Sequence, residues 1–250
     1  QQPDLIITDV KLPDANAITA LLLAEIEGSG TISLQAFWAR RARRLLPALF
    51  GLLLGVVVYA RLWSPAIDLG EIRGAGLAAL VYVSNWRDIL HGANYWDISK
   101  SPSPLQHLWS LAIEEQFYVV WPLVVVAATR GRSLRAAARR TMTVALSGAA
   151  LSLLVWLVTN LLSASDVRMY EGTDTRAFGL LIGAALGSWW QLERRRTDGP
   201  SPLARAFVTA GPAAALALGA AWVMLDGRSP VLLQQGGLPA CSVLAVIVLA

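Results

Sequence analysis

The stretch from Ser103 to Pro122, SPLQHLWSLAIEEQFYVVWP, places several ionisable side chains in a segment that is apolar enough to enter a bilayer. A charged side chain at bilayer depth costs roughly 2.5–3.5 kcal/mol on insertion scales, so such groups are candidates for function. In a helix, His107, Glu114 and Tyr118 share one face. His107 and Glu114 would lie about 10 Å apart along the axis, so they could line one cavity without bonding each other. The competing interpretation is an ordinary membrane helix with a polar outer end.

The composition is typical of a membrane protein. Of the 250 residues, 55% are hydrophobic and 15% are charged, whereas soluble domains contain about 25% charged residues. Several apolar runs near 20 residues long alternate with arginine clusters, a pattern typical of a multi-pass helical bundle. We therefore expect an all-α, polytopic transmembrane helical bundle. The net charge of +4 fits the positive-inside rule, and no nucleic-acid motif is present.

The apolar runs predict membrane spans at 45–63, 107–128, 141–162 and 204–225, with another beginning at 238–250. Residues 71–90 are flanked by Arg73 and Arg87. If they crossed the membrane, the arginines between 130 and 140 would lie outside, against the usual bias. We therefore expect 71–90 to be re-entrant or interfacial. The single cysteine, Cys241, and the two histidines form no metal-ligand spacing, so we expect no metal site.

Two further clusters carry charge near the ends of predicted spans. Arg40, Arg41 and Arg44 precede the first span. Guanidinium groups pair bidentately with phosphates, but the positive-inside rule alone would also place arginines there. Asp174 and Arg176 lie at the mouth of a later predicted span, which ends at Trp189-Trp190, and there they could pair with each other or bind a substrate. Glycines at 179, 183 and 187 follow at a spacing typical of close helix packing.

These segments together resemble one known family. The pattern His107-x-Trp109-Ser110-Leu111-x-x-Glu114-x-Gln116-Phe117-Tyr118, closed by Trp121-Pro122, is similar to the signature of the membrane acyltransferase-3 family. The arginine step followed by Pro47 and the segment Thr173-Asp174-Thr175-Arg176-Ala177 also resemble that family. Phe178 departs from the family pattern, which has an acidic residue there. The resemblance covers roughly residues 18–250.

The resemblance implies a bacterial integral-membrane O-acyltransferase that modifies cell-surface polysaccharide, lipopolysaccharide or peptidoglycan. Such an enzyme moves an acyl group, with acetyl expected, from acyl-CoA to a hydroxyl of a cell-surface glycan or lipid. Acyl-CoA is then a donor substrate and no permanently bound cofactor is expected. The implied partners are the lipid bilayer, acyl-CoA and a glycan or lipid-linked acceptor. The implied location is the bacterial inner membrane, with multiple passes.

Acyl transfer to a hydroxyl requires a base, a site for the thioester and donors for the developing oxyanion. The expected catalytic residues are His107, Glu114 and Glu115, and the resemblance implies that Arg40, Arg41 and Arg44 hold acyl-CoA. The expected substrate-binding residues are Trp109, Ser110, Gln116, Tyr118, Asp174 and Arg176. Family members usually carry another histidine, in a first transmembrane helix, and the resemblance makes it the expected base. We expect this chain to lack that helix.

Residues 1–17 do not fit the membrane pattern. Residues 3–14 resemble a short part of a response-regulator receiver domain, by chance or through a fusion, and cannot bury a core alone. We therefore divide the chain into an atypical fragment, 1–17, and a partial acyltransferase-3 transmembrane domain, 18–250. Two alternatives stay open: an inactive fragment of the family and a non-enzymatic, flippase-like transporter. A transporter would be expected to show inverted repeats with broken helices, and none is evident.

Overall fold

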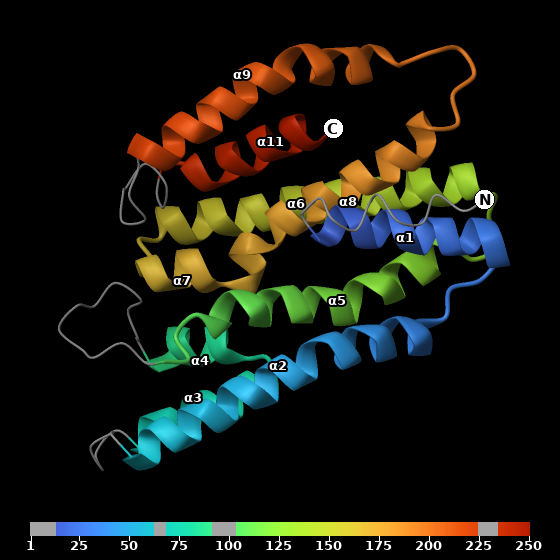
Figure 1. The fold of residues 1–250 in the computed structure, drawn as a ribbon. Coiled ribbons are helices and arrows are strands. Elements are labelled where there is room, and N and C mark those ends of the chain that lie inside the picture. The colour runs from blue at the N-terminus through green and yellow to red at the C-terminus, as the bar shows by residue number, and fades with distance from the viewer. Residues whose placement is uncertain (1–13, 63–68, 92–103, 225–234) are drawn as a thin grey trace.

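The computed structural model describes residues 14–62, 69–91, 104–224 and 235–250. Residues 3–13 of the receiver-like stretch lie outside that part of the chain. Helices make up all the regular secondary structure of the described residues, as the sequence predicts (Figure 1). Their bounds are α1 (Asp14–Ser29), α2 (Leu34–Leu62), α3 (Leu69–Leu80), α4 (Ser84–His91), α5 (Leu108–Thr129), α6 (Leu134–Leu161), α7 (Asp166–Glu171), α8 (Thr173–Glu193), α9 (Pro202–Met224) and α11 (Gly237–Leu249).

Within the described residues, four helices are long and apolar enough to cross a membrane: α2, α5, α6 and α9. Each overlaps most of one span predicted from the apolar runs. The further span predicted after Arg176 corresponds to α8, which is not among these four helices. The longest, α2, has 29 residues, or about 43 Å at 1.5 Å per residue, which exceeds a hydrocarbon core of about 30 Å. The prediction of an all-α, multi-pass membrane bundle is confirmed.

Residues 69–91 form two short helices rather than one span. α3 has 12 residues, or about 18 Å, which is too short to cross the hydrocarbon core. Helix α3 ends at Leu80, and in the turn that follows Tyr82 adopts a left-handed backbone conformation with φ 54°. This break agrees with the expectation that 71–90 does not cross fully.

The core is built around α8, which packs against α1, α5, α6, α7 and α11. Its small residues permit this, because a Cβ at Gly187 would overlap the backbone carbonyl of Asn16 in α1. Two hydrogen bonds hold α1 in place: Trp121 Nε1 donates to Thr19 Oγ1 at 2.8 Å and Gln191 Nε2 donates to the carbonyl of Ala20 at 3.0 Å. The predicted domain boundary at residue 17 therefore falls inside a helix that belongs to the bundle.

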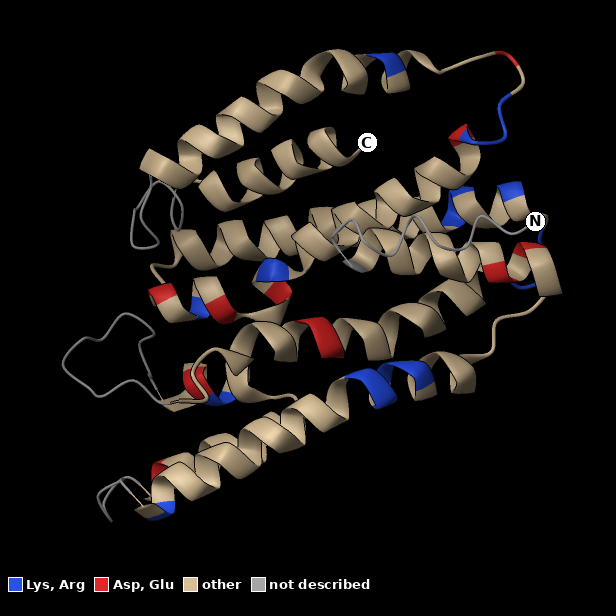
Figure 2. Ribbon diagram, viewed as in Figure 1, with Lys and Arg blue, Asp and Glu red and all other residues tan. Residues whose placement is uncertain are grey.

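Positive charge gathers at one end of the bundle, where α1 joins α2, α5 joins α6 and α8 joins α9 (Figure 2). We call this the basic end. Ion pairs fasten it: Glu27 pairs with Arg194 and Arg195, and Glu25 lies 3.9 Å from Arg40. At the opposite end, arginines of α4 and α7 alternate with carboxylates. The positive-inside rule predicts that the basic end faces the cytoplasm, and this orientation stays a prediction.

Candidate functional site

The first part of the site is the start of α5, at the end of the bundle opposite the basic end. α5 begins at Leu108, directly after the exposed His107, and runs to Thr129 with Pro122 inside it. Ser110 Oγ donates to the carbonyl of His107 at 3.2 Å. The start of α5 therefore carries an exposed histidine and a hydroxyl within one turn of each other, as expected for the polar end of this segment.

A pocket of about 200 Å³ lies between this turn and α8, and we call it the α5–α8 pocket. The polar side chains in its lining include Ser110, Glu114, Arg176 and Ser242 of α11. Four predicted site residues from two separate motifs thus meet here, since Trp109 also lines the pocket. The complete lining is Trp109, Ser110, Ile113, Glu114, Arg176, Phe178, Gly179, Leu180 and Ser242.

Aromatic rings fix the wall of the pocket next to α7. The ring centroids of Trp109 and Tyr170 lie 4.9 Å apart, and Arg176 Cζ lies 5.0 Å from the centroid of Tyr170. A guanidinium over an aromatic face is attracted by the ring quadrupole. Tyr170 therefore holds Arg176 at the pocket, and no carboxylate of the described residues forms an ion pair with it.

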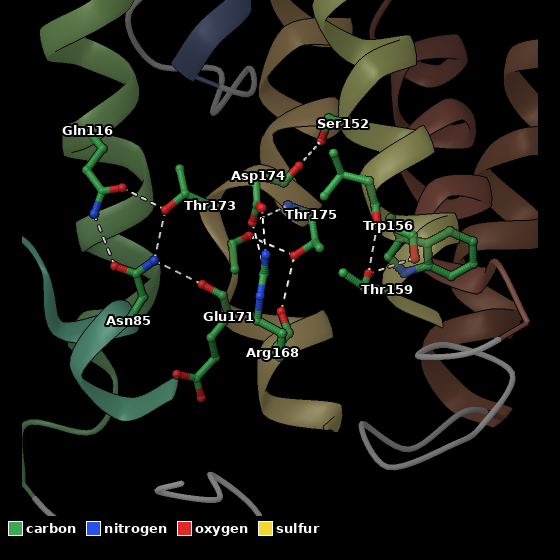
Figure 3. A network of polar contacts seen from close by, with 12 residues as sticks. Asn85, Gln116, Ser152, Trp156, Thr159, Arg168, Glu171, Thr173, Asp174 and Thr175 are labelled. Carbon is green, nitrogen blue, oxygen red and sulfur yellow. Dashed lines mark hydrogen bonds and ion pairs between the residues drawn. The ribbon is translucent and has the colours of Figure 1, made fainter. Parts of the chain in front are cut away.

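A hydrogen-bond network lies beside the pocket and joins α4, α5 and α8 (Figure 3). Gln116 Nε2 donates to the Asn85 side-chain oxygen at 3.1 Å, and Gln116 Oε1 accepts from Thr173 Oγ1 at 2.6 Å. Asn85 Nδ2 donates to Thr173 Oγ1 at 2.9 Å and to the carbonyl of Glu171 at 3.0 Å. Both oxygen and nitrogen of the Gln116 amide are thus used within the protein.

Asp174 pairs with Arg168 of α7 rather than with Arg176. Arg168 reaches both carboxylate oxygens, at 2.8 and 2.6 Å, which is the bidentate geometry that a guanidinium favours. Ser152 Oγ donates to the Asp174 carbonyl at 2.5 Å and accepts from the N–H of Phe178 at 3.0 Å. These bonds fix the first turn of α8 and so the position of Arg176.

A second ion pair, which is largely buried, joins α2 to α5. Arg41 Nε lies 2.9 and 3.0 Å from the two carboxylate oxygens of Glu115, and the side chains of this pair are only 15% and 9% exposed. Arg41 Cζ also lies 3.3 Å from the ring centroid of Tyr118, and Trp38 Nε1 donates to the Tyr118 carbonyl at 3.1 Å. α2 is therefore fixed against α5 one residue beyond Glu114.

With this geometry in view, comparison with known proteins identifies the chain's relatives. The family model described as an acyltransferase domain matches residues 17–250. The chain belongs to the acyltransferase-3 family.

Named relatives agree with this membership. The chain is 37% identical over 237 residues to the peptidoglycan O-acetyltransferase OatA of Listeria monocytogenes, covering 93% of this chain and 37% of that protein. It is also 37% identical over 240 residues to the putative peptidoglycan O-acetyltransferase YrhL of Bacillus subtilis, covering 93% of this chain and 36% of that protein. The chain thus spans about a third of the length of these relatives. No solved structure matches it.

The acyltransferase-3 signature residues divide into three groups in this fold. Trp109, Ser110, Glu114 and Arg176 line the α5–α8 pocket, with His107 one turn before Ser110. Gln116 and Asp174 are held in the adjoining network, and Glu115, Tyr118 and Arg41 form the contact between α2 and α5. Arg40 and Arg44 are exposed on α2 near the basic end. The catalytic and donor-binding roles of these residues stay predictions.

The structure also adds residues that the sequence did not single out. Asn85 is fully buried and joins three elements, yet it lies in a short helix with no recognised motif. Glu171 is 1% exposed, and among the described residues its Oε2 has no hydrogen-bond partner. Burial, followed by the nearby carboxylate of Asp88, raises the pKa of Glu171 to about 8. The only sequence signal for Glu171 was its position two residues before the motif that begins at Thr173.

Proposed function

We propose that this chain forms the membrane-embedded part of an O-acyltransferase that moves an acyl group, acetyl in the first place, from acyl-CoA to a hydroxyl of a cell-surface glycan. The glycan of peptidoglycan is the first candidate acceptor, because the relatives OatA and YrhL are named for peptidoglycan O-acetylation. The bacterial inner membrane is the proposed location. The observation that carries the proposal is the meeting of Glu114, Ser110 and Arg176 in one pocket.

The pocket supplies the groups that acyl transfer requires. The acceptor hydroxyl gives its proton to a base, for which Glu114 and the neighbouring His107 are the candidates, and its oxygen attacks the acyl carbonyl. The resulting oxyanion needs a fixed positive donor, and Arg176 is held for that role by Tyr170. When the carbon–sulfur bond breaks, CoA leaves as a thiol after taking up a proton.

The two substrates approach from opposite ends in this proposal. Arg40 and Arg44 are exposed on α2 near the basic end and are the candidates for holding the phosphates of acyl-CoA. Arg41 is occupied by Glu115, so it would bind a phosphate only after leaving that carboxylate. The α5–α8 pocket, near the other end, then receives the acyl group and the glycan hydroxyl.

The proposal is tested with the chain in nanodiscs, supplied with radiolabelled acetyl-CoA and soluble peptidoglycan glycan fragments. We expect ester-linked acetate on the glycan, and we expect Glu114→Gln and Arg176→Gln each to lower the rate. Glu27→Gln is the matched control, because Glu27 pairs with Arg194 and Arg195 at the basic end. If acetyl-CoA neither binds nor loses its acetyl group while the chain moves a glycan lipid across vesicles, the transporter alternative replaces the proposal.

A further inference from the structure

A second hollow lies between α2 and α3, apart from the α5–α8 pocket. We call it the α2–α3 groove. Its volume is about 280 Å³ and its walls are almost entirely aliphatic. The side chains that form most of it are Leu53, Val56 and Val57 of α2, Ile72 and Leu77 of α3, and Leu105.

The walls of the groove continue into exposed aliphatic surface. α2 is one of the helices able to span the membrane. Val57 and Leu77, one from each wall, are 55% and 57% exposed although both are aliphatic. Exposed aliphatic surface on a membrane helix is normal where it meets hydrocarbon chains. A groove in such a surface fits an acyl chain better than it fits water or a polar peptide.

Two arginines interrupt the apolar lining. Arg61 in the last turn of α2 and Arg73 of α3 both line the groove, and both are exposed. Neither forms an ion pair or hydrogen bond with another residue in the described part of the chain. Glu71, the carboxylate nearest to Arg73 in the sequence, is already paired with Arg87 at 2.7 Å. The groove therefore carries two positive charges that the surrounding described residues leave unneutralised.

The position of these arginines differs from that of the topological clusters. They lie at the end of the bundle opposite the basic end, where the positive-inside rule disfavours arginine. The presence of arginine at this end therefore requires an explanation other than membrane topology. A phosphate provides one, because guanidinium groups bind phosphate oxygens in a fork geometry.

We propose that the α2–α3 groove binds one anionic diacyl phospholipid, with its phosphate between Arg61 and Arg73 and an acyl chain along Leu53, Val57 and Leu77. Two guanidinium groups favour a headgroup with net negative charge, because the ammonium of a zwitterionic lipid would offset the attraction of its own phosphate. The site lies in the leaflet opposite the basic end. The proposal does not depend on the acyl-transfer activity.

The test compares lipids retained by the purified chain. The wild-type chain is reconstituted in nanodiscs of equal parts phosphatidylglycerol and phosphatidylcholine, released into mild detergent and examined by native mass spectrometry. We expect one phosphatidylglycerol molecule to be retained in preference to phosphatidylcholine. The double variant Arg61→Gln, Arg73→Gln should lose about tenfold in that preference, which is roughly the effect of two weakened charged contacts.

Two controls make the result decisive. Arg205→Gln removes an exposed arginine of α9 that does not line the groove, so it should retain the wild-type preference. Leu77→Trp fills the groove while keeping both arginines, so it should reduce retention. Equal retention of the two lipids by the wild type, or equal loss in Arg205→Gln, would overturn the proposal. Displacement of phosphatidylglycerol by an equimolar polyprenyl phosphate would also overturn it, in favour of a lipid-linked occupant.

Discussion

Glu114 and Glu115 are neighbours in sequence, yet α5 turns them toward different surroundings. Glu114 lines the α5–α8 pocket and is half-buried, whereas Glu115 is held by Arg41 at 9% side-chain exposure. Adjacent residues on a helix point about 100° apart, so this separation follows from helix geometry. The same chemical change at the two positions should therefore have different effects.

We predict that Glu114→Gln lowers the rate of acetyl transfer by about 10²–10⁴-fold, the usual contribution of a general base, without loss of thermal stability. Glu115→Gln should instead lower stability, because it leaves the buried Arg41 without its anionic partner, a change that costs about 3–5 kcal/mol when a buried pair is broken. Transfer assays and detergent melting curves check both variants. Unchanged transfer in Glu114→Gln together with a lowered melting temperature would assign Glu114 a structural role.

Glu171 allows a prediction about pH. Burial raises the pKa of Glu171 from 4.5 to about 8, so between these values the folded chain binds a proton that the unfolded chain has lost. Stability should therefore fall as the pH rises from about 5 to above 8. Glu171→Gln, which keeps a neutral side chain at every pH, should flatten that fall. Melting temperatures at pH 5 and pH 8.5 check it, and an equal decline in both proteins would contradict the assignment.

At the scale of elements, the docking of α1 against α8 depends on one small residue. A Cβ at Gly187 would overlap the Asn16 carbonyl and lie 2.8 Å from Asn16 Oδ1, so backbone must move to admit it. We predict that Gly187→Ala destabilises the bundle by about 1–3 kcal/mol, the usual cost of overpacking.

The matched control for that change is Gly219→Ala in α9. A Cβ at Gly219 meets nothing within 4 Å, so alanine should be neutral or slightly stabilising in this helix interior. Both variants are compared with the wild type in thermal denaturation in the same detergent. Equal melting temperatures for Gly187→Ala and Gly219→Ala would show that α1 is not tightly packed on α8.

The elements themselves were largely predictable, but their partners were not. Apolar runs marked α2, α5, α6 and α9, and the two short helices at 69–91 agree with the expectation, from arginine bias, that 71–90 does not cross fully. Local sequence patterns do not indicate which side chains from distant parts of the chain will be in contact. Arg41 and Glu115 are 74 residues apart in the sequence, so their pairing depends on the packing of α2 against α5. The pairing of Asp174 with Arg168 likewise depends on the packing of α7 against α8. The central packing of α1 against α8 is likewise visible only in the assembled bundle.

At the scale of the whole molecule, the arginine clusters and the candidate functional sites lie toward opposite ends of the bundle. The clusters Arg130–Arg140 and Arg194–Arg196 lie at the basic end, while the α5–α8 pocket, the network around Asn85 and the α2–α3 groove lie toward the other end. If the basic end is cytoplasmic, the proposed site for the acceptor hydroxyl faces away from the cytoplasm. This arrangement suits an enzyme whose donor and acceptor are on different sides of a membrane.

The orientation is tested by cysteine labelling in a Cys241→Ala background, since Cys241 is the only cysteine in the sequence. Ser133 and Thr197 are exposed at the basic end, and Ser163 is exposed at the other end. We predict that Ser163→Cys reacts with a membrane-impermeant maleimide in intact cells, whereas Ser133→Cys and Thr197→Cys react only after lysis. The reverse pattern would place the α5–α8 pocket near the cytoplasm, where it could receive acyl-CoA directly, and the proposed glycan acceptor would then have to be abandoned.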